Sequence, residues 1–355
     1  AELLQINFTL LLQELTLKEI VIGNGMEDPA YEIIRQAIKK RSFYKNQVNA
    51  FQCQVYIKGQ LRLQDYPATI FGQKVDFADG DTSKNKMIYL SETIATYSFQ
   101  KPEKEKVEVT STRVSGQADG FGFGSPRYVT FYDNNIQISK ALNPRGFISP
   151  IAENALNFYH YKFMGSFTEN GRLINHIKVT PKRSYEPLFS GYINIVEDEW
   201  RIHSVDLMLT KESQMELADT LRIEHLYVPV TNDIWMIHSQ VVYPAVKMFG
   251  FDAKGSFVTV YSNYELDPEF DKNFFNNIIL KYDTGSNKKP RAYWDTVRPV
   301  PLLDDEIMDY LKKDSLEIVR RDPRYLDSVD RRKNRFTFGG ILLFGQTFNR
   351  QSKKS

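Results

Sequence analysis

Two β-rich runs meet at an Asn-Gly pair in FYHYKFMGSFTENGRLINHIKVT, residues 158–180. Residues 158–167 and 172–180 are rich in aromatic and β-branched side chains, which strands favour. Asn170 and Gly171 tolerate the positive φ angles that a two-residue hairpin turn requires. The segment therefore predicts a β-hairpin, and antiparallel pairing is the expectation for the rest of the chain.

Further β-rich runs extend on both sides of this hairpin. Between residues 51 and 63, Phe51, Cys53, Val55 and Ile57 alternate with polar residues, the period of a strand with one buried face. Comparable runs lie at residues 87–99, 107–114, 128–132, 188–196, 201–209, 221–230, 234–243, 248–251 and 255–264. Parallel strands need long crossovers, and little helix separates these runs. We expect a mainly β fold, with a large curved antiparallel sheet or a partly open barrel.

Helices are expected at the two ends of this β region and once inside it. Asp28 and Pro29 form an N-cap followed by proline at the first helical position, which predicts one N-terminal helix from Pro29 to about Lys40. Ser149 and Pro150 predict a short helix over residues 151–156. Residues 302–321 carry apolar side chains at roughly helical spacing among charges, so a C-terminal helical arm, continuous or broken, is expected there.

The composition excludes several classes of partner and site. The 355 residues include 46 basic and 44 acidic side chains, a net charge of +2, which gives no global field to attract nucleic acid. We therefore expect no nucleic-acid partner. A single cysteine, Cys53, excludes an internal disulfide and a multi-cysteine metal site. Because it lies in an alternating apolar run, we expect it to be a small buried hydrophobe.

No motif for catalysis stands out. The five histidines fall in predicted strands without the i, i+4 spacing of a helical zinc pair. The chain also lacks a Gly-x-Ser-x-Gly elbow, a phosphate-binding Gly-Lys-Ser/Thr loop and a dinucleotide fingerprint. We expect no enzyme, no cofactor and no metal. A hydrolase acting on envelope material is the least favoured alternative, since it needs two carboxylates facing each other across a cleft.

A basic stretch runs directly into an apolar one near the C-terminus. Residues 336–348 are too few for a spanning helix but match the length of one transmembrane β-strand. A single strand cannot insert alone, so this interpretation requires further strands beyond Ser355. The other interpretation is an ordinary core or edge strand. The candidate membrane-proximal residues are Arg331, Arg332, Lys333, Arg335, Phe336 and Phe338.

Several short motifs together carry a family resemblance. They are EDPAY at 27–31, YIKG at 56–59, YLSE at 89–92, PRGFISPIA at 144–152, FSGYI at 189–193, WRIHS at 200–204 and AYWD at 292–295. With them the chain resembles, from about residue 15 to 348, a Bacteroidota outer-membrane family of unknown function. That family is described as an uncharacterised domain together with a carboxypeptidase-like regulatory domain, a name that implies a sandwich fold and no peptidase.

The resemblance implies a three-part design, with an N-terminal β-sandwich, a periplasmic middle region and a C-terminal outer-membrane β-barrel. This chain resembles the middle region. Residues 1–26 would be the end of the preceding sandwich or a linker, and residues 27–267 the curved antiparallel domain with its helix. Residues 268–335 would be a linker and helical arm, and residues 336–355 the approach to the barrel.

By that resemblance the chain is expected to be a non-catalytic binding or scaffolding module at the periplasmic face of the outer membrane. It would reach the membrane through a barrel outside this chain and bind an envelope protein or lipid. The pattern of one helix and a curved sheet is also similar to lipoprotein carriers, which cover an apolar cavity with a helix. A periplasmic lipid or lipoprotein carrier or chaperone is therefore the alternative. Tyr159, Tyr161 and Phe163 are the candidates for an apolar surface or cavity, with ordinary packing as the other interpretation.

Overall fold

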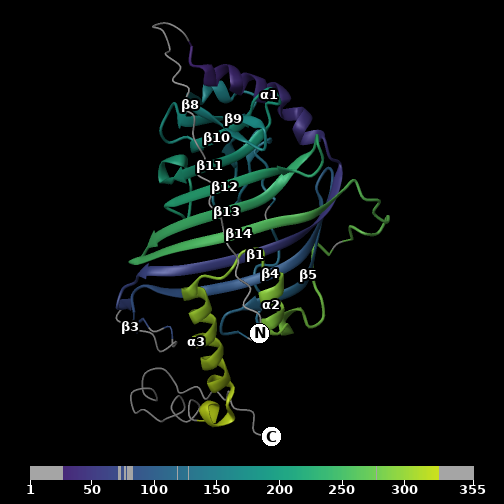
Figure 1. Cartoon of the computed structure of the whole chain (residues 1–355). Coiled ribbons are helices and arrows are strands. Elements are labelled where there is room, and N and C mark those ends of the chain that lie inside the picture. Colours follow the sequence, from purple (N-terminus) through teal and green to yellow (C-terminus); the bar gives the residue numbers. More distant parts are fainter. Residues whose placement is uncertain are drawn as a thin grey trace.

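In a computed structural model of the chain, the described residues form one eleven-stranded sheet with helices near its two ends (Figure 1). The structure describes residues 27–327 except 71–72, 76, 78–82, 118, 127 and 277. The strands of the sheet are β1 (Ala50–Asp65), β4 (Lys86–Gln100), β5 (Lys104–Val114), β8 (Tyr159–Glu169), β9 (Arg172–Pro181), β10 (Ser190–Val196), β11 (Ile202–Thr210), β12 (Thr220–Pro229), β13 (Trp235–Met248), β14 (Phe251–Leu266) and β15 (Leu280–Tyr282).

The remaining elements are short strand pairs and helices. They are β2 (Thr69–Ile70), β3 (Gln73–Lys74), β6 (Asn135–Ile136), β7 (Phe147–Ile148), the α-helices α1 (Pro29–Asn46), α2 (Arg291–Val297) and α3 (Asp304–Arg321), and the 3-10 helices η1 (Ala155–Asn157), η2 (Lys211–Ser213) and η3 (Ser286–Lys288). None of the described helices is both long and apolar enough to cross a membrane.

The strands follow the order β15-β5-β4-β1-β14-β13-β12-β11-β10-β9-β8. Each pair of neighbours is antiparallel except β15, which runs parallel to β5, so the sheet is formally mixed. It stays open, with β8 at one edge and β15 at the other. This confirms a mainly β protein built on one large, curved and unclosed sheet.

The hairpin at residues 158–180 is formed as predicted. Strands β8 and β9 pair from Tyr159 opposite Pro181 to Glu169 opposite Arg172. Between them Asn170 has a φ of 49° and Gly171 a φ of 77°, the left-handed backbone that the turn needs. The Asn-Gly pair therefore fixes the register of the edge strand.

One face of the sheet, which we call the inner face, carries the main apolar core. The β1 side chains of Phe51, Cys53, Val55 and Ile57 point to it and are buried. Helix α1 covers the inner face at the β8 end with Ala30, Ile33, Ile34 and Ala37, and the connection 128–158 covers its middle with buried side chains such as those of Phe131, Phe147 and Ile151. The alternation in β1 thus predicted the buried face correctly.

The opposite, outer face is covered near β1 and β4 by the C-terminal helices. Tyr56 and Lys58, which alternation placed toward solvent, are buried because α2 and α3 lie over them. Lys58 Nζ donates to Glu306 Oε2 at 2.9 Å, and both side chains are less than a tenth exposed. In Figure 1, α3 crosses the lower end of the sheet and continues past it.

Three local predictions differ from the structure. Helix α1 continues six residues beyond Lys40, because Tyr44 packs on Tyr132 with ring centroids 5.8 Å apart. Residues 151–154 form turns that lead into the 3-10 helix η1, so no α-helix forms over residues 151–156. Residues 128–132 are irregular, since they pack on the inner face instead of joining the sheet. Helix α3 is continuous, and α2 was not predicted.

Candidate functional site

A pocket of about 530 Å³ opens at one end of the inner face. It lies between the C-terminal end of α1, the irregular segment 128–133, the turn joining β4 and β5, and the adjoining ends of β12 and β13. Its volume falls in the range of about 300–1,000 Å³ that is common for small-molecule sites. The covering of the inner face is thus incomplete at this end, and a ligand-sized space remains.

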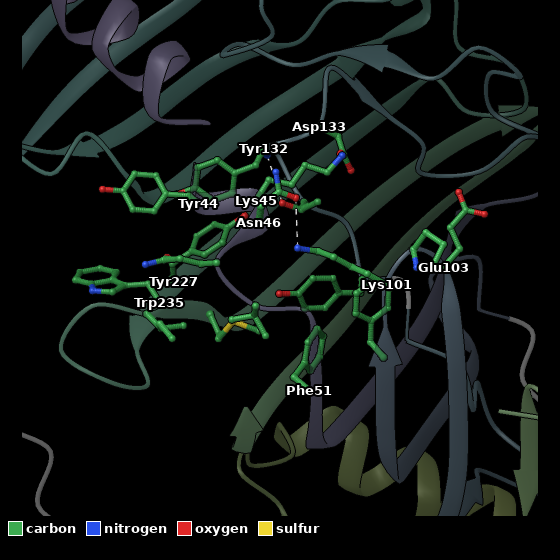
Figure 2. A pocket seen from close by; sticks show the side chains of 18 of the residues that line it. Tyr44, Lys45, Asn46, Phe51, Lys101, Glu103, Tyr132, Asp133, Tyr227 and Trp235 are labelled. Carbon is green, nitrogen blue, oxygen red and sulfur yellow. Dashed lines mark hydrogen bonds and ion pairs between the residues drawn. The ribbon is translucent and has the colours of Figure 1, made fainter. Parts of the chain in front are cut away.

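The pocket wall is mainly aromatic. The Phe51 ring lies 5.2 Å from that of Tyr128 and 5.8 Å from that of Tyr97, and the Tyr132 ring lies 6.0 Å from that of Tyr227. Figure 2 shows Tyr44, Tyr132, Tyr227 and Trp235 along one side and Phe51 below them. The aromatic lining residues are Tyr44, Phe51, Tyr97, Phe99, Tyr128, Tyr132, Tyr227 and Trp235.

The strand pattern explains how the aromatic wall forms. Phe51 of β1 lies directly opposite Phe99 of β4, and Tyr97 stands two residues away on the same face of β4. Burial raises the pKa of the Tyr97, Tyr132 and Tyr227 phenols. These hydroxyls therefore stay protonated near neutral pH, so they offer hydrogen bonds but no base.

Arg201 lies beside two aromatic residues of the pocket wall. The Arg201 guanidinium lies 4.8 Å from the centroid of the Tyr44 ring and 5.3 Å from that of Trp235. Its charge is balanced by Glu199 at 2.6 Å, and its Nη1 donates to the Asp233 carbonyl at 3.0 Å. These contacts connect the arginine to the two aromatic rings of the wall.

The charged rim of the pocket carries two lysines. Lys45, on the last turn of α1, forms an ion pair with Asp133. Lys101, in the turn between β4 and β5, donates from Nζ to Asn46 Oδ1 at 3.4 Å. Burial, and then the nearby charge of Lys45, lower the pKa of Lys101. The pocket therefore combines an apolar wall with a partly desolvated cation, that of Lys101.

The cavity candidates from the sequence lie elsewhere on the inner face. Tyr159 and Tyr161 are buried under α1, where their hydroxyls donate to the carbonyls of Ile148 and Pro150. Phe163 is partly buried against the same core. None of the three lines the aromatic pocket, and a role toward a ligand stays a prediction for them. The membrane-proximal candidates, Arg331, Arg332, Lys333, Arg335, Phe336 and Phe338, lie outside the described residues.

The pocket itself was not predicted, because its lining comes from six separate segments of the sequence. The available signals were the high aromatic content and the core-facing Phe51.

Cys53 is buried as expected, and burial raises the pKa of its thiol to about 12. Within the part of the chain that the structure describes, no group of three or more His, Cys, Asp or Glu side chains is placed to hold a metal ion.

A second groove, of about 680 Å³, lies on the outer face between α2, α3 and the sheet. Its wall includes Arg113 and Arg298, whose charges are already balanced. Arg113 pairs with Asp314 at 2.6 Å, and Arg298 pairs with Glu92 at 2.5 Å. The groove therefore offers a ligand less unpaired polarity than the aromatic pocket does.

The fold and the pocket together define the class of protein: an open, single-sheet β protein in which helix and loop segments cover most of the inner face and an aromatic pocket remains at one end of that face. The chain belongs to DUF5686, a family of unknown function, whose model matches residues 33–264. This agrees with the resemblance to an uncharacterised domain. Among curated proteins, none matches the chain.

Solved structures give distant likenesses. The chain is similar to a DUF1329 family protein from Desulfovibrio piger, with 10% identity, a TM-score of 0.30, and coverage of 71% of this chain and 98% of that one. It is similar to a putative outer membrane lipoprotein-sorting protein domain from Vibrio parahaemolyticus (12% identity, TM-score 0.29, coverage 70% and 97%). It is also similar to a LolA superfamily protein from Nitrosomonas europaea (12%, 0.25, 69% and 96%). At these identities and TM-scores, the likenesses carry no functional inference.

Proposed function

We propose that the chain is a non-catalytic binding module of the bacterial cell envelope, whose aromatic pocket holds an apolar group of its ligand. The observation that carries the proposal is the cavity of about 530 Å³ with eight aromatic residues in its wall. Transfer of an apolar group from water into such a site is favourable by about 25 cal/mol per Å² of apolar surface. The raised pKa of the wall phenols, which keeps them protonated, supports binding rather than acid–base chemistry.

The pocket favours a lipid or an acylated protein as the ligand, which is the carrier alternative from the sequence. A binding module that presents its ligand to a membrane-embedded partner needs the same pocket. The two versions differ in whether the ligand leaves with this chain or stays with a larger assembly. Both require that an apolar group enters between α1 and the turn joining β4 and β5.

The module would act at the periplasmic face of the outer membrane. The basic residues Arg331, Arg332, Lys333 and Arg335 and the apolar run 336–348 support this location, because together they match a membrane-proximal collar and one membrane strand. Fractionation of cells that make the whole protein, with protease treatment of intact and opened cells, tests the location. Recovery in the cytoplasmic fraction would rule it out.

A neutral apolar dye tests the pocket directly. N-phenyl-1-naphthylamine should bind with a fluorescence increase and be displaced by long-chain alcohols. Val48→Trp, at the mouth, should fill the pocket and weaken dye binding at least tenfold. Val319→Trp, on the exposed side of α3, is the matched control and should leave binding unchanged. No dye binding in the unmodified chain, or equal binding in a folded Val48→Trp variant, would refute the proposal.

A further inference from the structure

Lys101 is one of the residues that line the aromatic pocket. Its backbone N–H donates to the Asn49 carbonyl at 2.9 Å, which fixes the turn between β4 and β5 beside the start of β1. From there the side chain reaches the pocket wall, and its nitrogen faces Asn46 (Figure 2). The backbone of Lys101 is therefore fixed, and the printed hydrogen-bond partner of its ammonium is the neutral amide of Asn46.

Two of the carboxylates near Lys101 have other partners, and two more, those of Glu103 and Glu105, line the pocket without forming an ion pair to it. Asp133 pairs with Lys45, and Asp267 accepts from the backbone N–H groups of Asn49 at 3.0 Å and Ala50 at 2.9 Å. Figure 2 shows Glu103 pointing away from the aromatic side chains. Among the described residues, no carboxylate forms an ion pair with Lys101, and its hydrogen bond to Asn46 is long.

An unpaired, partly desolvated cation costs free energy in the empty pocket and favours an anion there. We propose that the natural ligand is an anionic amphiphile, whose headgroup pairs with Lys101 while its apolar part lies against the aromatic wall. The inference rests on the proposed function, because it names the chemistry of the ligand that the same pocket would hold. Lys45 lies near Lys101 at the rim, where Asp133 balances its charge.

Two other ligand chemistries fit the pocket less well. Aromatic clusters can hold quaternary ammonium groups, but such a cation would face the ammonium of Lys101. A free inorganic anion would gain one charge contact and leave the aromatic wall without a partner. An anionic group joined to an apolar chain uses both parts of the site.

Displacement of the neutral dye by four twelve-carbon amphiphiles tests the inference. The competitors are dodecanoate, dodecyl phosphate, dodecanol and dodecyltrimethylammonium, each below its micelle concentration, with inorganic phosphate alone as a fifth. Both anions should bind roughly tenfold or more tightly than dodecanol, the size of a charge-assisted contact. Lys101→Met should remove this preference and leave dodecanol binding unchanged. Lys140→Met, at an exposed turn, is the control and should keep the preference.

Each contrary outcome has a distinct meaning. Equal binding of dodecanoate and dodecanol, or a preference that survives Lys101→Met, would overturn the inference and leave the apolar pocket intact. Tighter binding of dodecyltrimethylammonium would overturn it in favour of a cationic ligand, and competition by inorganic phosphate equal to that of dodecyl phosphate would overturn it in favour of a free anion. If none of the five competes and the dye itself does not bind, the proposed function fails as well.

Discussion

The ion pair between Arg298 and Glu92 should decide whether the C-terminal helices stay on the sheet. Arg298 Nε donates to Glu92 Oε1 at 2.5 Å and Nη2 donates to Oε2 at 2.9 Å, so the contact is bidentate. The Glu92 side chain is fully buried and that of Arg298 is 8% exposed. Arg298→Met would leave the buried carboxylate with the Tyr56 hydroxyl, 2.9 Å away, as its main partner.

Removal of one partner from a buried pair costs about 3–5 kcal/mol, because the other charge stays desolvated and uncompensated. That is a large part of the roughly 5–15 kcal/mol by which folded domains are stable. Replacement of both partners by apolar side chains, Glu92→Leu with Arg298→Met, removes the buried charge itself. The double variant should therefore recover most of the lost free energy of unfolding.

Urea unfolding followed by circular dichroism measures these differences. Hydrogen exchange over residues 291–321 should become faster in the single variant, because this stretch contains α2 and α3. Arg222→Met is the matched control, since Arg222 makes a bidentate contact with Asp206 at the surface and is 48% exposed. It should cost less than about 1 kcal/mol. A loss in Arg298→Met no larger than in this control, or a double variant as unstable as the single one, would refute the reasoning.

Three further results are expected. Burial lowers the pKa of His225 to about 3, so as the pH falls the unfolded chain takes up a proton at this side chain before the folded chain does. The free energy of unfolding is therefore unaffected by His225 above about pH 6.5 and falls by roughly 1.4 kcal/mol per pH unit below it. Urea unfolding at pH 7.5 and 4.5 should show His225→Leu gaining on the unmodified chain at the lower pH, and an unchanged difference would contradict this. Gly191→Ala should cost about 3 kcal/mol or more, because φ is +137° and a Cβ would lie 2.2 Å from the Asp206 carbonyl oxygen. Gly171→Ala, where a Cβ would meet open space, should cost about 1 kcal/mol. Equal losses of stability in thermal unfolding would contradict this difference. Cys53, with a pKa of about 12, should resist iodoacetamide at pH 8 until urea unfolds the chain, and rapid labelling of the folded chain would disprove its burial.

Local signals in the sequence predicted the elements of the fold well. Asn170 and Gly171 located the edge hairpin, and the alternation from Phe51 to Ile57 identified the inner face. These predictions succeeded because turn geometry and strand periodicity depend on neighbouring residues. The side chain of Lys58 was misplaced for the same reason, since its burial depends on Glu306, far away in the chain.

Contacts between distant segments could not be predicted in this way. Residues 128–132 have strand-like composition, yet the sheet has no place for them, and they cover the core instead. The aromatic pocket shows the same limit. Tyr44 lies in the last turn of α1 and Lys101 follows β4, and both line the pocket because α1 ends beside the turn between β4 and β5.

The place of β1 in the sheet bears on how the chain becomes folded. Among the described strands, β1, β4 and β5 form one ribbon and β8 to β14 another, and the two pair with each other only through β1 and β14, as at Val55 opposite Tyr261. Pairings between residues so far apart in sequence form slowly. Until β14 is available for pairing, β1 stays unpaired along one side of the first ribbon. A chain in which β14 has not yet paired therefore presents the open edge of β1 to any neighbouring chain. Pairing of β1 with β14 removes this site of aggregation.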